Sequence, residues 1–176
     1  FCVFSSSETV LAQLGFCNGN SGPPVFTENF GTGTTSNALP AGTTTYSYIN
    51  GSPNDGQYTV SNSTAFFDWH NIPDHTSGDT NGRCLIVNAD FTPVEFYRTT
   101  VTGLCETTTY EFSSWLINLL PASGCGGSGI PINVRFEIWD NTNSVRLAFG
   151  NTGDIFGSNT PNWEEFALVF KTSIAQ

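Results

Sequence analysis

Short segments in which apolar and polar residues alternate run along most of the chain, with turn-forming residues between them. Alternation with a period of two predicts β-strands, whereas a helical period is confined to a turn or two near the start. The expected strands are 25–30, 43–49, 57–61, 65–69, 84–89, 95–102, 108–119, 132–140, 144–149 and 163–172. Short strands joined by Gly- and Asn-rich turns predict an all-β fold, an antiparallel β-sandwich or jelly roll.

The strand expected at 132–140 has the clearest pair of faces. One face is apolar: Ile132, Val134, Phe136 and Ile138. The other face is mixed: Asn133, Arg135, Glu137 and Trp139. An aromatic ring stacks on the C–H face of a pyranose while polar groups bond its hydroxyls, so the mixed face predicts a glycan-binding platform. Tyr97 and Asn88 are its expected neighbours; the alternative is an ordinary polar face with Trp139 covered by a loop.

The segment 110–117 lacks clean alternation, because both of its faces carry apolar residues. This pattern is typical of a central strand packed on two sides. It predicts that Trp115 belongs to the core. Trp163, which follows Pro161 closely, is expected to pack at a corner where its strand begins.

The irregular run 68–82 carries three carboxylates, two histidines, one proline and two glycines. Calcium takes several oxygen ligands in flexible geometry, so an oxygen-rich loop that turns into a strand suits this ion. The spacing is not that of an EF-hand. The alternative is a surface loop whose Asp and Asn side chains bond their own backbone.

Composition narrows the range of partners. The chain has 176 residues, enough for one domain, which we place at 13–176. Its formal net charge is -10 with only five Lys and Arg, which argues against nucleic acid and anionic membrane surfaces as partners. No segment is long and apolar enough to span a bilayer, so membrane insertion is not expected. Neutral sugars, cations and basic protein patches remain as partners on this composition, and the glycan or other copies of the chain are the partners we expect.

Five cysteines are present without a CxxC pair, which disfavours a zinc ribbon. An Asn-x-Thr site at Asn62, the acidic composition and the many turns suit a secreted or cell-surface protein, where disulfides persist. We expect a disulfide between Cys105 and Cys125. Cys17 would then pair with Cys84 or with a cysteine outside this sequence.

The first twelve residues have two interpretations. Residues 1–12 resemble the tail of a secretory signal peptide, with Ala12 before the cut. The alternative is a short N-terminal strand.

No catalytic motif is apparent, so we do not expect an enzyme. Glu164 and Glu165 are adjacent and point to opposite faces of a strand, so they cannot flank one bond. Glu111 and Glu137 could face each other only if their strands pair. Nucleophile elbows, HExxH helices and phosphate loops are absent from the sequence, which leaves glycoside hydrolysis as a minor third hypothesis.

An ordered set of motifs spans the chain from Val25 to Phe170. Its members are Val25-Phe26-Thr27-Glu28-Asn29-Phe30-Gly31-Thr32-Gly33, Asp74-His75-Thr76, Asp79, Asn81-Gly82, Leu85-Ile86-Val87-Asn88-Ala89, Phe96-Tyr97, Val101-Thr102-Gly103-Leu104-Cys105-Glu106, Thr109-Tyr110-Glu111-Phe112, Trp115, Asn133-Val134-Arg135-Phe136-Glu137-Ile138, Gly150-Asn151-Thr152-Gly153-Asp154-Ile155 and Trp163-Glu164-Glu165. The set resembles the extracellular jelly-roll module of large surface adhesins of gliding bacteria, secreted by the type IX route. It is also similar to MAM domains and to jelly-roll carbohydrate-binding modules.

The resemblance implies a structural calcium ion near the first strand, with Glu28 and Asp74 as ligands. Asp79 and Asn81 join this metal set mainly through the loop argument. Such modules continue through further strands at the C-terminal end, so the resemblance implies either a fragment or strands supplied by another chain. Cys84 stands where an apolar residue is usual and is expected as a buried free thiol.

Together these observations predict a non-catalytic extracellular adhesion module that binds glycan and holds structural calcium. The alternative is a structural spacer or filament subunit that assembles through an open sheet edge.

Overall fold

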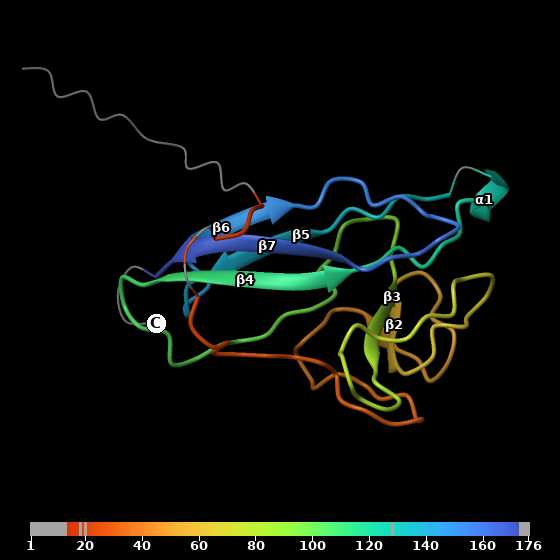
Figure 1. Ribbon diagram of the computed structural model, residues 1–176, viewed down its shortest axis with the longest axis horizontal. Helices are drawn as coiled ribbons and strands as arrows, with labels where there is room; N and C mark the ends of the chain where they lie inside the picture. The colour runs from red at the N-terminus through yellow and green to blue at the C-terminus, as the bar shows by residue number, and fades with distance from the viewer. Residues whose placement is uncertain (1–13, 18, 20, 128, 173–176) are drawn as a thin grey trace, which may run out of the picture.

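The computed structural model describes residues 14–17, 19, 21–127 and 129–172. Its regular elements are β1 (Ser47–Tyr48), β2 (Gln57–Ser61), β3 (Cys84–Asn88), β4 (Thr109–Leu116), α1 (Gly124–Gly127), β5 (Arg135–Trp139), β6 (Arg146–Asn151) and β7 (Glu164–Lys171) (Figure 1). The single helical element is one turn whose Cys125 and Gly126 have left-handed backbone angles. The all-β class is therefore confirmed.

The strands form three small sheets, and none of them closes. The first has the order β1-β2-β3, with β1 parallel to β2 and β2 antiparallel to β3. The others are the antiparallel pairs β4-β7 and β5-β6. In Figure 1, β2 and β3 run across the direction of β4 and β7.

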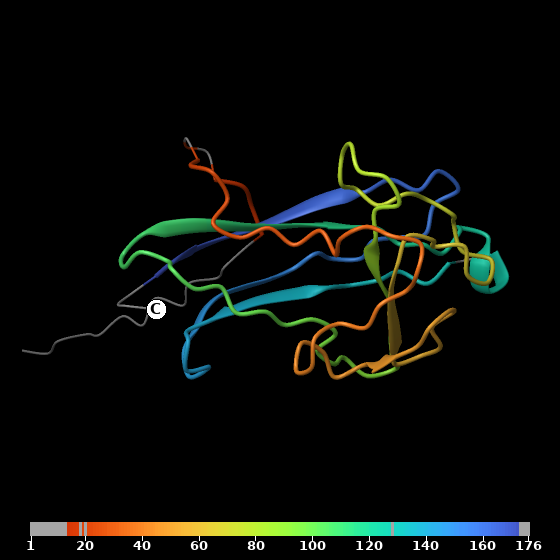
Figure 2. The ribbon, with the colours of Figure 1, turned by 90° about the horizontal axis from the view of Figure 1, so that it is seen from below.

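The β4-β7 and β5-β6 pairs lie as two layers with a shared core. Figure 2 shows the two layers nearly edge-on. The rings of Phe112 on β4 and Phe136 on β5 meet edge to face, with centroids 5.2 Å apart. Leu168 on β7 and Ala148 on β6 are 0% and 4% exposed. A two-stranded sheet is marginal alone in water, so this shared apolar interior is what stabilises both pairs.

The predicted faces of β5 are confirmed. Residues 132–139 alternate strictly between half-buried and exposed positions. The half-buried residues are Ile132, Val134, Phe136 and Ile138, and the exposed ones are Asn133, Arg135, Glu137 and Trp139. The period-two pattern therefore predicted correctly which face of this strand packs against the core.

Three expected strands, 25–30, 65–69 and 95–102, are not strands in the structure. In the first, side chains take the backbone donors that a ladder would need. Glu28 Oε1 accepts from the Phe30 N–H at 2.7 Å, and Asn29 Oδ1 accepts from the Gly31 N–H at 3.0 Å. Local side-chain bonds of this kind compete with sheet formation. Phe30 and Phe67 also have positive φ, which interrupts an extended backbone.

The prediction for β4 and Trp115 was also wrong. β4 alternates between exposed and half-buried residues over its whole length and pairs with β7 alone. Trp115 lies on its outer face and is 39% exposed. Trp115 is instead contacted by His75 of the 68–82 loop, which sequence periodicity does not report.

The segment that leads into the fold lies against β6 and β7. The Gly15 N–H donates to the Ala167 carbonyl at 2.8 Å. Leu14 packs so close to Gly150 that a Cβ on this glycine would stand 2.8 Å from the leucine side chain. The prediction for residues 1–12 lies outside the described residues. None of the described segments forms a helix with the length and apolar character that a bilayer span requires.

The shared core makes a testable prediction. Leu168→Ala removes a fully buried side chain, so we expect it to lower the free energy of unfolding by about 2–5 kcal/mol. Urea denaturation followed by tryptophan fluorescence measures this change. Phe91, which is 92% exposed, is the control, and Phe91→Ala should stay within about 0.5 kcal/mol of wild type. Equal losses in both variants would contradict the location of the core.

Candidate functional site

The outer face of the β5-β6 hairpin is organised by the carboxylate of Glu137. Its Oε1 pairs with Arg135 Nε at 2.7 Å and with Arg146 Nη1 at 3.1 Å. Its Oε2 accepts a hydrogen bond from the Trp139 indole at 2.9 Å. Both oxygens are thus occupied by charge-assisted or directed donors, and the indole plane of Trp139 is fixed beside the strand.

A β-bulge brings Arg146 to this face. The pairing shifts between Ile138 and Trp139, so that Trp139 stands opposite Arg146 and Leu147 has no partner. Without the shift, simple alternation would turn Arg146 toward the core. Bulges commonly re-aim a side chain in this way. The Arg146 guanidinium lies 4.1 Å from the ring centroid of Phe149 and 5.8 Å from that of Trp139.

Phe149 completes a row of rings and cations across the hairpin. It stands opposite Glu137 in the register, and the Arg135 guanidinium lies 5.1 Å from its ring centroid. Contacts of a guanidinium with an aromatic face are favourable and hold the long arginine side chains over the sheet. Arg146 and Phe149 were missed at the sequence level, because only the bulged register reveals which side of β6 faces outward.

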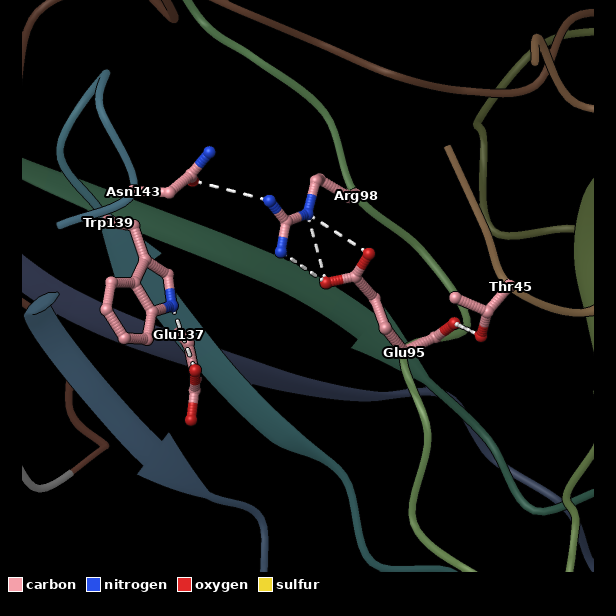
Figure 3. Close-up of polar contacts among 6 residues, drawn as sticks. All are labelled: Thr45, Glu95, Arg98, Glu137, Trp139 and Asn143. Atoms are coloured by element: carbon pink, nitrogen blue, oxygen red, sulfur yellow. Dashed lines mark hydrogen bonds and ion pairs between the residues drawn. The ribbon is translucent and has the colours of Figure 1, made fainter. Parts of the chain in front are cut away.

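A third arginine stands beside the turn of the hairpin (Figure 3). Arg98 forms a two-pronged ion pair with Glu95, with Nη2 2.7 Å from Oε2, and its Nη1 donates to Asn143 Oδ1 at 3.3 Å. Glu95, and more weakly Glu137, raise the pKa of Arg98. The backbone of Glu95 is tied to Thr45, whose hydroxyl donates to its carbonyl at 2.7 Å. These contacts link the 95–98 segment to the hairpin turn.

Asp140 shapes that turn. Its carboxylate accepts from the N–H groups of Ser144 and Val145 at 2.8 and 3.2 Å, and from the hydroxyls of Thr142 and Ser144, each at 2.9 Å. Desolvation acts to raise the pKa of Asp140, but the four hydrogen bonds outweigh it and lower the pKa from 3.8 to about 2. The ionised form is therefore the one that holds the turn.

The remaining residues expected at the glycan platform have other partners. Asn133 shares the outer face, and its amide donates to Asp154 at 3.1 Å. Tyr97 packs its ring against Phe30 with centroids 5.8 Å apart, and burial, followed by the charge of Glu28, raises its pKa. Asn88 lies on β3, where its amide donates to the Pro53 carbonyl at 3.0 Å. Tyr97 and Asn88 are thus not brought to the β5-β6 face.

In the acidic loop, two of the expected metal ligands converge on Gly82. A Cβ built on this glycine would overlap Oδ1 of both Asp74 and Asp79, so the two oxygens lie close to one another. The other oxygen of Asp74 accepts from the Thr76 N–H at 2.9 Å. The other oxygen of Asp79 is buried and has no hydrogen-bond partner among the described residues. An unpartnered buried carboxylate oxygen is costly unless a cation satisfies it.

The other two expected ligands flank this pair. The 31–33 segment pairs with 81–83, since the Gly33 N–H donates to the Asn81 carbonyl and the Arg83 N–H to the Gly31 carbonyl. Glu28 precedes this pairing and bonds Phe30. Within the described residues, no three His, Cys, Asp or Glu side chains are grouped to hold a metal. An ion here would therefore take its remaining oxygens from amide and backbone carbonyls and water, as calcium does.

Trp115 takes part in an aromatic cluster that anchors the same loop. The His75 ring stacks on Trp115 with centroids 3.7 Å apart and meets Trp163 edge to face at 6.0 Å. The Trp163 indole donates to the Pro73 carbonyl at 3.3 Å. His75, the residue after Asp74, is thus packed on the outer face of β4. Trp163 packs where β7 begins, as its position after Pro161 predicted.

The expected disulfide is not formed. Cys17, Cys84, Cys105 and Cys125 are all free in the described structure. Cys105 precedes the start of β4, and Cys125 lies in α1 beyond its other end, so the strand stands between them (Figure 1). Cys84 is half-buried as a free thiol, and burial, followed by the charge of Asp74, raises its pKa to about 12.

Glu111 and Glu137 do not face one another. Glu111 lies on the exposed face of β4 and accepts from the Cys17 N–H, whereas Glu137 lies on the exposed face of β5. The two strands belong to different layers, so these carboxylates point away from each other on opposite sides of the core.

Comparison with known proteins found no matching family, no matching curated protein and no matching solved structure.

The turn at Asp140 predicts an acid-sensitive contribution to stability. A carboxylate with a lowered pKa stabilises the fold above its unfolded value and loses this effect as pH falls through the folded value. The melting temperature of wild type should exceed that of Asp140→Asn above pH 3.8, and the gap should close as pH falls to about 2. Thermal melts across this range, with Asp55→Asn as a control, measure it. A gap that persists at pH 2 would show that ionisation is not what holds the turn.

Proposed function

We propose that this protein is a non-catalytic extracellular recognition module that binds glycan on the outer face of the β5-β6 hairpin. One observation carries the proposal: Trp139 is 38% exposed while its indole N–H is held by Glu137, itself paired with two arginines. A partly exposed ring held by a hydrogen bond is available for stacking, and because it loses little side-chain freedom the cost of binding is lowered.

We also propose that the chain has the architecture of a jelly-roll module of the adhesin type. Two antiparallel layers with a common core, crossed by a third sheet, are compatible with that plan. The low content of basic residues and the turn-rich chain support a secreted or cell-surface location. Adhesion to a surface polysaccharide would be its role there.

A structural calcium ion is the second part of the proposal. Asp74 and Asp79 would supply carboxylate oxygens, and Asn81 and Glu28 would complete the set around the 31–33 and 81–83 pairing. The buried, unpartnered oxygen of Asp79 supports this. The ion would neutralise two adjacent carboxylates and hold the loop closed without touching the glycan.

The open sheets favour one alternative function. Among the described residues each layer has two strands, so it offers backbone edges on which a further strand could add. A spacer or filament subunit would use these edges to bind other copies of itself. Such a protein would form oligomers that depend on concentration and would show no saturable glycan binding.

The glycan proposal predicts an asymmetry between two tryptophans. Trp139→Ala should weaken binding at least tenfold in a glycan and polysaccharide array followed by calorimetry, because the stacking surface is lost. Trp115 is equally exposed on the other layer, so Trp115→Ala is the matched control and should keep the affinity. Equal losses, or a folded protein that binds no polysaccharide while forming oligomers, would favour the spacer function.

The calcium proposal predicts a stability linkage. At a calcium concentration a hundredfold above its Kd, a bound ion adds about 2.7 kcal/mol to stability, so a chelator should lower the melting temperature by several degrees. Asp79→Asn and Gly82→Ala should abolish the response, the first by removing a ligand charge and the second by displacing both carboxylates.

The control is Asp55→Asn, since Asp55 is an exposed acid outside this loop, and it should keep the full response to chelator. If the melting temperature of wild type is the same in calcium and in chelator, the loop holds no ion and its carboxylates serve only backbone contacts.

A further inference from the structure

We propose that the β5-β6 face selects an acidic polysaccharide, with Arg135 and Arg146 receiving a sugar carboxylate beside Trp139. This inference rests on the glycan-binding function proposed above and adds the chemical class of the ligand.

The distribution of charge is the first argument. The chain has fifteen acidic residues and only five basic ones, and three of these five gather at the hairpin: Arg98, Arg135 and Arg146. Arg98 is neutralised by its own partner, Glu95. Arg135 and Arg146 share the single carboxylate of Glu137, so this group of three side chains carries one positive charge in excess, while Asp154 beside Asn133 and Asp140 in the turn place carboxylates at the two ends of the face. An anion would be repelled by most of the molecule and attracted to the middle of this face, between the two arginines.

The hydrogen-bonding capacity of Arg135 is the second argument. Arg135 pairs with Glu137 through Nε, and its two terminal nitrogens make no hydrogen bond to any described residue. Its side chain is 48% exposed, so it can be reached by a ligand. Two parallel N–H donors match the spacing of the two oxygens of a carboxylate and form the strongest kind of charge-assisted pair.

The surroundings of the arginines are the third argument. Arg146 lies over Phe149 and between that ring and Trp139, and Arg135 lies over the same Phe149. The rings restrict both guanidinium groups, so less freedom is lost when an anion binds. The Trp139 ring flanks the cations and would stack on the sugar whose carboxylate they receive. A uronic acid has both the sugar ring that would stack on Trp139 and the carboxylate that the arginines would receive.

The geometry also sets the extent of the site. The outer face runs from Asn133 to Trp139, a distance of about 20 Å along the strand. A polymer of acidic sugars could therefore contact the cations at the centre of the face and the amide of Asn151 beside them. Asn151 stands opposite Arg135 in the register, which places its position next to the guanidinium.

The experiment compares polygalacturonate with the same polymer after chemical reduction of its carboxyl groups. Affinity electrophoresis and calorimetry would give the Kd for each, at fixed ionic strength and calcium concentration. We expect at least tenfold tighter binding to the acidic polymer. Arg135→Gln should remove most of this difference and leave binding to the reduced polymer nearly unchanged. Arg135→Lys should retain only part of it, because lysine keeps the charge without the paired donors.

Lys171→Gln is the matched control, since Lys171 is an exposed cation on the other layer, and it should behave as wild type. Dextran sulfate distinguishes a carboxylate from any anion. If dextran sulfate binds as tightly as polygalacturonate, and if Arg135→Gln and Lys171→Gln weaken its binding equally, the attraction is a general charge effect and the inference is overturned.

Two further outcomes separate this inference from the proposed function. If both polymers bind equally and Trp139→Ala abolishes both, glycan binding stands and the selection of acidic sugars is overturned. If neither polymer nor any neutral polysaccharide binds, while the melting temperature shows a folded protein, both proposals fail.

Discussion

The structure depends on one constraint: two-stranded sheets cannot stay ordered in water unless each buries one face against the other. The edge-to-face contact between Phe112 and Phe136 lies where the two layers meet. Because strand residues alternate between faces, burying Phe136 and Ile138 sends Arg135, Glu137 and Trp139 outward as a set. The candidate site is therefore a direct consequence of core packing, and its three side chains keep their relative positions as long as the layers stay together.

Sequence patterning predicted this part of the molecule well, because the alternation in 132–139 is complete and one face is wholly apolar. Patterning failed where the register between strands, local hydrogen bonds or loop contacts determine the structure. The bulge that turns Arg146 outward depends on the register between strands, which no single-strand pattern contains. Glu28 and Asn29 bond their own backbone and prevent the expected first strand. Trp115 was assigned to the core because periodicity does not show which apolar residues pack under loops.

The acidic loop is positioned from two sides. On one side, the 31–33 and 81–83 segments exchange backbone hydrogen bonds. On the other, His75 stacks on Trp115 and meets Trp163 edge to face. The metal-site prediction, made from residue types, thus falls on a loop in which the carboxylates of Asp74 and Asp79 lie close together. The sequence could not show that Asp79 would leave an oxygen buried without a partner, since this depends on how closely the chain approaches Gly82.

Gly82 has a consequence for how this protein tolerates mutation. The space beside its Cα is already filled by oxygens of Asp74 and Asp79, so even a methyl group there would force both carboxylates to move. A deep mutational scan would therefore rank position 82 among the most intolerant, although the residue has no side chain to lose. Genetic variation at this codon would disable the loop while leaving every one of its oxygen-bearing residues intact.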